Sequence, residues 1–155
     1  MRSVGLSFQK GRMRLTVLEI VDEKVKYQDG RPITVDPDLP IPDLMDRYAT
    51  QVRTLIGEFT PNIVAVRQVW DSKNVDAAMC QVAPPGITAY VCHERGISFA
   101  SYTPQALRQP KPFGLDRGVN PLEAVDGIFG QHPPYWDDMQ KASLLVAWRA
   151  LLECK

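Results

Sequence analysis

The run from Ile63 to Val69 constrains the fold more than any other segment. It is apolar throughout except for Arg67 and Gln68. Such a run is typical of a parallel strand that is buried on both faces at the centre of a sheet. Apolar residues at helical spacing precede it in residues 43–59 and follow it in residues 74–82. We therefore expect an α/β fold whose sheet is covered by helices on both faces.

The N-terminal part of the chain predicts an antiparallel meander. Apolar-rich segments separated by turn-forming residues are typical of short strands joined by hairpins, and they occupy residues 2–9, 13–21 and 24–28. Asp29-Gly30 closes the meander in this interpretation. Four prolines in residues 32–42 predict a loop that leads into the first helix.

The second half of the chain continues the alternation of strands and helices. Pro84-Pro85-Gly86 is expected to break the second helix. The segments that follow predict a buried strand at Ile87–Cys92, a short strand at Ile97–Ser101, a short helix at Pro104–Arg108 and a final helix at about Trp136–Glu153. Residues 109–134 are rich in proline and glycine, and we expect a flexible or functional loop with a short helix at Pro121–Phe129.

Composition excludes several classes of protein. Lys plus Arg equals Asp plus Glu, at 18 each. This balance argues against a dedicated nucleic-acid binder, because that class usually has a basic excess. The three cysteines, Cys80, Cys92 and Cys154, are odd in number and widely spaced, so we expect reduced thiols, with the first two in the core. With neither a secretion signal nor an apolar run long enough to span a bilayer, we expect a cytoplasmic protein and no membrane partner.

The middle of the chain carries a family resemblance. Residues 65–70, AVRQVW, followed by Lys73-Asn74, resemble the central segment of RuvC-type Holliday-junction resolvases. In that family the strand ends in an acidic residue, then glutamine, an apolar residue and an aromatic. The segments at residues 4–6, 102–108 and 138–147 are similar to the family's other landmarks. The resemblance implies one RNase H-like domain over residues 1–155, with a mixed five-stranded sheet whose first three strands are antiparallel.

The resemblance also implies an acidic metal site, which is degenerate in this chain. The family's four acidic positions fall on Ser7, Arg67, Asp138 and Lys141. Magnesium needs carboxylate oxygens, and only Asp138 supplies one. Two unit charges 4 Å apart interact by about 4 kcal/mol at an effective dielectric constant near 20, and a divalent ion would feel roughly twice that repulsion from each cation. We therefore expect no metal and no confident catalytic residue at this site.

Two questions about this site stay open at the sequence level. Arg67 and Lys141 could contact phosphate directly, or Arg67 could pair with Asp138 in a salt bridge that replaces the metal. We favour the salt bridge, because a buried arginine needs a partner. Alternatively, acids elsewhere in the chain could form a relocated metal site, the candidates being Asp71, Asp76, Asp116, Glu123, Asp126 and Asp137.

A candidate nucleic-acid surface combines Arg67 with other basic residues that are scattered along the sequence. Tyr102 and Phe113 could stack on bases. The alternative for the basic residues is that they are ordinary surface charge. The basic members are Lys10, Arg12 and Arg14 near the first turn, Lys73 at the start of the second helix, and Arg108, Lys111 and Arg117 around the long loop.

Three functions follow from these features. The first is a RuvC-like protein without catalytic activity that binds nucleic acid or a protein. The second is a structure-selective DNA endonuclease with a relocated site, which alone would need Mg²⁺. The third is a pure interaction or assembly protein. The resemblance implies branched or duplex DNA as a partner, and it implies a homodimer. Met79 and Met139 are candidate dimer contacts, and packing in the core explains them equally well.

Overall fold

A mixed sheet with the strand order β3-β2-β1-β4-β5 forms the centre of the molecule. The computed structural model of the chain describes residues 1–69 and 74–154. The antiparallel strands are β1 (Arg2–Gln9), β2 (Arg12–Val21) and β3 (Lys24–Thr34), and β4 (Ile63–Arg67) and β5 (Ser98–Tyr102) continue the sheet in parallel with β1. The predicted RNase H-like arrangement of five strands is confirmed.

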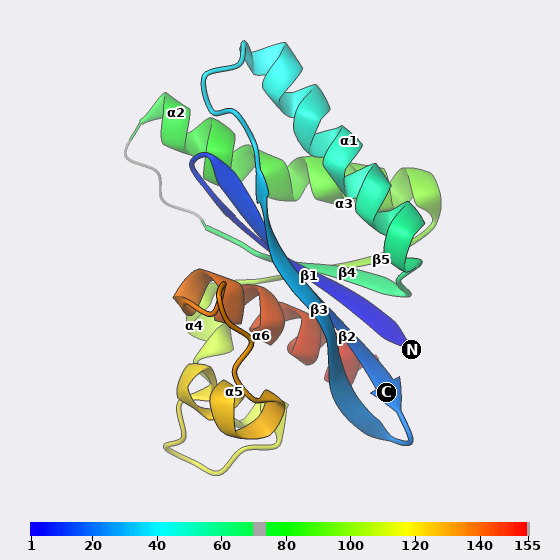
Figure 1. Cartoon of the computed structure of the whole chain (residues 1–155), viewed down its shortest axis with the longest axis vertical. Helices are drawn as coiled ribbons and strands as arrows, with labels where there is room; N and C mark the ends of the chain where they lie inside the picture. The colour runs from blue at the N-terminus through cyan, green and yellow to red at the C-terminus, as the bar shows by residue number, and fades with distance from the viewer. Residues whose placement is uncertain (70–73, 155) are drawn as a thin grey trace.

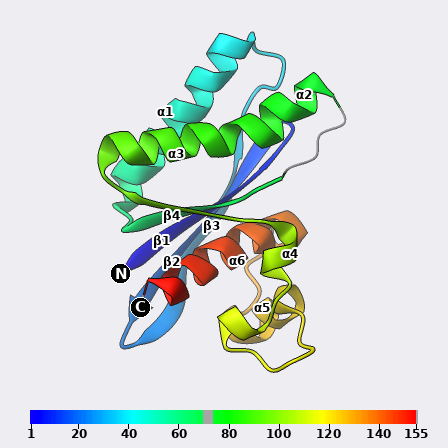
Figure 2. The same ribbon diagram turned by 180° about the vertical axis from the view of Figure 1, so that it is seen from behind.

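Helices cover both faces of this sheet (Figures 1 and 2). One face carries α1 (Ile41–Phe59) and a continuous helical run made of α2 (Val75–Ala77), the π-helical segment η1 (Ala78–Val82) and α3 (Ala83–Arg95). The other face carries α6 (Asp138–Glu153), with α4 (Pro104–Leu107), the 3₁₀ turn η2 (Lys111–Phe113) and α5 (Pro121–Phe129) on the same side. Asp137 caps α6, whose first residue, Asp138, lies two residues after the predicted start at Trp136.

The prediction of a buried strand at Ile87–Cys92 is wrong, because these residues lie within α3. The two prolines do not break the helix. They follow the wider π turn, in which the Ala83 N–H bonds the Ala78 carbonyl, and they occupy the first turn of α3, where a missing N–H costs little. A short apolar run fits a buried strand and a buried helical face equally well, so periodicity could not separate the two.

The third strand is longer than its sequence pattern predicted. Asp29-Gly30 does not end it, because a register shift against β2 at Val17/Leu18 lets the pairing continue to Thr34. Pro32 is tolerated because β3 is the edge strand of the sheet. The loop before α1 is correspondingly shorter than predicted.

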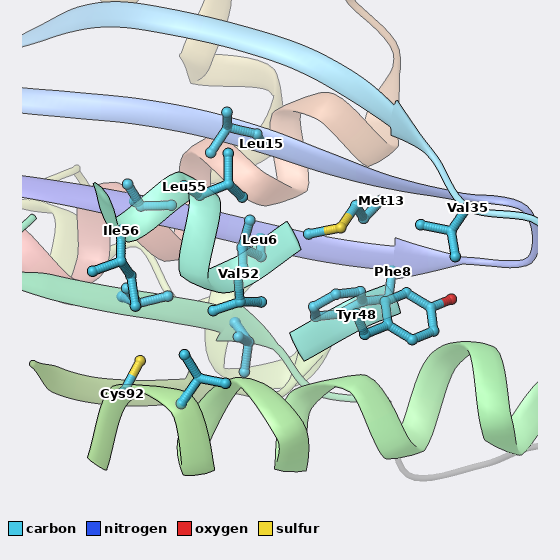
Figure 3. Close-up of a cluster of buried hydrophobic side chains, with 14 of the residues drawn as sticks. Leu6, Phe8, Met13, Leu15, Val35, Tyr48, Val52, Leu55, Ile56 and Cys92 are labelled. Atoms are coloured by element: carbon cyan, nitrogen blue, oxygen red, sulfur yellow. The ribbon is translucent and has the colours of Figure 1, made fainter. Parts of the chain in front are cut away.

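Two hydrophobic clusters lie on opposite faces of the sheet. Figure 3 shows the cluster under α1 and α3. In it, the rings of Tyr48 and Phe8 pack edge to face, with their centroids 5.9 Å apart. Cys80 and Cys92 are buried in this cluster and Cys154 is exposed, which confirms the predicted core role of the first two. Burial raises the pKa of the Cys92 thiol to about 11.

The second cluster packs α6 directly on β1. A side chain at Gly5 would collide with the backbone of Ser143 and with Ala147, so glycine is required for this close approach. Ser3 Oγ donates a hydrogen bond of 2.9 Å to the Ala147 carbonyl. The contact brings the start of α6 over the C-terminal end of β1.

Residues 109–134 also pack on α6. The ring centroids of Phe113 and Phe129 lie 4.8 Å and 5.1 Å from that of Trp148. Trp148 is buried in the core, as we expected. The short helix predicted at Pro121–Phe129 is confirmed with those bounds. The flexibility of the segment stays a prediction, as does the assignment of residues 1–155 to a single domain.

Across the described parts of the chain, no helix has both the length and the hydropathy to span a bilayer.

Candidate functional site

The C-terminal ends of two central strands and the N-terminal end of α6 meet at one edge of the sheet. Ser7 lies near the end of β1, Arg67 ends the neighbouring parallel strand β4, and Asp138 begins α6. Ligands of open α/β sheets bind at such an edge. The fold therefore gathers three of the four positions at which an acidic site was expected.

Ser7 is committed to packing. Its side chain is fully buried, and its Oγ donates a hydrogen bond of 2.8 Å to the Met139 carbonyl in the first turn of α6. The hydroxyl therefore ties strand to helix and is not free to face a ligand.

Arg67 is partly buried and does not form the ion pair that we predicted. Among the residues that the structure describes, no carboxylate lies within ion-pair distance of its guanidinium, and Nη1 lies 4.0 Å from the sulfur of Met139. Asp138 is exposed at the first turn of α6, where water and the helix dipole stabilise its charge without Arg67. Burial and the nearby Arg108 lower the pKa of Arg67. Arg67 is thus a cation without a described counter-ion.

Lys141 points to α5 and not to the strand ends. Its Nζ lies 3.0 Å from Asp126 Oδ1 and 5.8 Å from the centroid of the Trp136 ring. Asp126 also accepts hydrogen bonds from Trp136 Nε1 at 2.7 Å and from Gln131 Nε2 at 3.2 Å. The bonds from Lys141 and Trp136 hold the pKa of Asp126 below its ordinary value. Lys141 therefore serves the packing of α5 on α6.

Arg14 is the residue whose role the sequence pattern concealed. We predicted it on the surface, but its side chain is 4% exposed and its strand position pairs with Ser7. Nη2 lies 2.7 Å from Asp137 Oδ2, while Asp137 Oδ1 accepts the Gln140 N–H as the cap of α6. A buried cation thus holds the start of the helix. The available signal was the position of Arg14 between Met13 and Leu15 in a strand that is buried on both faces.

A cavity opens beside Arg67. Its volume is about 310 Å³, and it lies between the end of β4, the short helix α4, the start of α5 and the start of α6. Its polar wall consists of Arg67, Arg108, Asn120 and Asp138, and its apolar wall of Pro104, Leu107, Leu122, Met139, Ala142 and Leu145. Arg67 and Arg108 carry two positive charges against the single negative charge of Asp138, so the cavity is suited to bind an anion.

Comparison with known proteins assigns the family. The profile of the family described as "Crossover junction endodeoxyribonuclease RuvC" matches residues 6–111. The chain belongs to the RuvC family. A RuvC of that description from Chloroflexus aurantiacus is 23% identical over 109 residues, which cover 70% of this chain and 66% of that protein. The match therefore spans slightly less than two thirds of the relative's length.

Solved structures extend the likeness to the whole fold. A Thermus thermophilus RuvC in complex with a Holliday junction substrate superimposes with a TM-score of 0.73 at 20% identity, covering 99% of this chain and 94% of that one. The yeast mitochondrial Holliday junction resolvase Ydc2 gives a TM-score of 0.67 at 13% identity, covering 98% and 80%. At these identities the likeness shows the fold, and it includes α6, which lies beyond the matched residues 6–111.

The donor set at the strand ends does not fit a divalent metal. Among the four residues at which we expected the family's acids, the Ser7 hydroxyl is bonded to the backbone, and Arg67 and Lys141 are cations. Only Asp138 offers carboxylate oxygens. No three Asp, Glu, His or Cys residues within residues 1–69 and 74–154 come close enough together to hold a metal ion.

The acids proposed for a relocated site do not gather either. Asp126 is paired with Lys141, and Asp137 with Arg14. Asp76, Asp116 and Glu123 are exposed, and they belong to no metal-holding cluster of described residues. Asp71 lies outside the described residues.

The remaining residues of the candidate nucleic-acid surface divide into exposed and buried groups. Arg108 lines the cavity, and Lys111 and Arg117 line a second hollow of about 400 Å³ in the segment that follows Arg108. Lys10 is exposed on the β1–β2 turn and Arg12 is exposed at the start of β2. This turn lies beside α2 in Figures 1 and 2. Within the described part of the chain, none of these five cations pairs with a carboxylate. Lys73 lies outside the described residues.

The two aromatic candidates are not placed to stack on bases. Tyr102 is 9% exposed, its hydroxyl donates a 2.6 Å hydrogen bond to Glu153, and the guanidinium of Arg149 covers its ring at 5.2 Å. Phe113 is buried against Trp148. Met79 packs against the core and Met139 lies against Arg67, so a homodimer through these two residues stays a prediction.

Proposed function

We propose that this RuvC-family chain binds DNA through backbone phosphates at the edge where β1, β4 and α6 meet, and that it does not cleave DNA. The observation that carries the proposal is the pair Arg67 and Arg108. Both line one cavity at the sheet edge where we expected the family's metal site, and neither forms an ion pair with a described carboxylate. Two guanidinium groups are suited to phosphate oxygens, which they can bind bidentately.

The wider surface supports the same partner. Lys111 and Arg117 add positive charge to a second hollow, which is lined by residues of the segment that follows Arg108. The chain as a whole is neutral, with 18 basic and 18 acidic side chains, so the binding surface is local. A RuvC from Thermus thermophilus has been solved with a Holliday junction substrate, and the fold of this chain matches that protein.

The lack of cleavage rests on the chemistry of the same positions. Hydrolysis of a phosphodiester by paired metal ions needs carboxylates that hold both ions. Here Ser7 is bonded to Met139 and Lys141 to Asp126, which leaves Asp138 as the one acid of the four. The arginines would bind the phosphate without activating a water.

Titration of a labelled four-way junction and a matched duplex tests the proposal. Binding should not require magnesium and should persist in EDTA. It should weaken steeply with salt, because phosphate contacts release counterions. The plot of log K against log salt has a negative slope, and Arg67→Ala and Arg108→Ala should each make it shallower by about 0.9. Arg47→Ala, an exposed change on α1 at the opposite face of the sheet, is the matched control.

Two results would overturn the proposal. Cleavage of either DNA in magnesium or manganese would show an active site that includes other acids. Absence of binding at low salt would leave a role in protein interaction or assembly.

A further inference from the structure

The cavity beside Arg67 is more apolar than a phosphate site requires. Six of its ten wall residues are apolar, and they come from three different helices, α4, α5 and α6. Phosphate groups need only donors and positive charge. Apolar walls with a few convergent polar groups are typical of a pocket for an organic ring.

The size of the cavity limits what can enter it. At about 310 Å³ it is near the lower end of small-molecule pockets, which run from roughly 300 to 1,000 Å³. A duplex is far too wide to enter, whereas one planar base fits. Leu107, Ala142 and Leu145 are themselves buried, so the inner wall is formed by the core and is pre-shaped.

The polar wall selects among the bases. Asp138 is exposed, has no described partner and can only accept hydrogen bonds when ionised. Asn120 Oδ1 accepts the Leu122 N–H at 3.1 Å, which leaves its amide group free to donate. A carboxylate matches the adjacent ring N–H and amino group of an unpaired guanine, and it repels the two carbonyls of thymine.

We propose that this cavity takes one unpaired guanine of a DNA strand whose flanking phosphates are held by Arg67 and Arg108. The inference rests on the proposed DNA binding and names the part of the DNA that enters the site. A base that is already unpaired enters at the lowest cost, because no pairing or stacking partner is lost. Branched and bulged DNA supplies such bases, whereas an intact duplex does not.

The test uses labelled duplexes that are identical except for one bulged nucleotide, which is guanine, adenine, cytosine or thymine, and a fully paired duplex. The bulged-guanine duplex should bind the full-length chain about tenfold more tightly than the bulged-thymine or the paired duplex, as expected for one good bidentate contact. Asp138→Asn should reduce the preference for guanine over thymine to less than about threefold without weakening binding of the paired duplex.

Leu122→Trp provides a second variant, because its partly exposed side chain would fill the cavity from the rim. It should abolish the preference of the chain for bulged DNA over the paired duplex. Equal binding of all five duplexes, still lost in Arg67→Ala, would overturn the guanine pocket and leave the phosphate site standing. Absence of binding to every duplex would instead refute the proposed function. A preference for bulged DNA that is independent of the base and persists in Asp138→Asn would also overturn the assignment of guanine.

Discussion

Asp137→Asn tests whether a buried ion pair holds the start of α6. The carboxylate faces Arg14 at 2.7 Å and caps the helix through its other oxygen, which accepts the Gln140 N–H. Asparagine is also a good capping residue, so this change keeps the cap and removes only the negative charge. Arg14 would then remain buried without a counter-ion.

The magnitude follows from the exposure of the two partners. Breaking a fully buried pair costs about 3–5 kcal/mol, whereas an exposed pair contributes about 0–1 kcal/mol. The Arg14 side chain is 4% exposed and that of Asp137 is 54% exposed, so the pair lies between these limits. We expect Asp137→Asn to lower the free energy of unfolding by about 2 kcal/mol. For a chain of this length that corresponds to a fall in Tm of about 4–8 °C.

Thermal and urea denaturation followed by circular dichroism measure this loss. Asp137→Ala removes the cap as well and should cost about 1 kcal/mol more. Asp116→Asn, which changes an exposed aspartate with no described ion pair, should stay within about 0.5 kcal/mol of the wild type. If Asp137→Asn melts at the wild-type temperature, the ion pair does not hold the helix and our account of Arg14 is wrong.

Three further predictions follow from other contacts. Gly5→Ala should destabilise the chain by about 3 kcal/mol or prevent folding, measured by urea denaturation, because the new methyl group meets the backbone of Ser143. The pKa of Asp126 is lowered by Lys141, so its contribution to stability is present above its ordinary pKa of 3.8 and is lost as pH falls through the lower folded value. The Tm difference between wild type and Asp126→Asn should accordingly be constant above about pH 5 and shrink below 3.8, and a difference that does not change with pH would contradict it. Of the three cysteines, only Cys154 should react with a thiol reagent in the native state, and faster labelling of the buried two would contradict their place in the core.

Local patterns in the sequence determined most of the fold and the composition of the site. The apolar run at Ile63–Val69, the meander before it and the helical spacing around it predict the order of elements, because apolar periodicity reports directly on which faces are buried. The residue types at positions 7, 67 and 141 could likewise be read from the chain. Their correspondence to the family's metal positions stays a prediction.

Only the tertiary structure decided which charges neutralise one another. Lys141 pairs with Asp126 because α5 packs on α6, and Arg14 reaches Asp137 because β2 is buried on both faces. Arg67 is left beside Arg108, against the salt bridge that we expected. Ion pairs depend on distances through space between segments that are far apart in the sequence, and no local pattern encodes those distances.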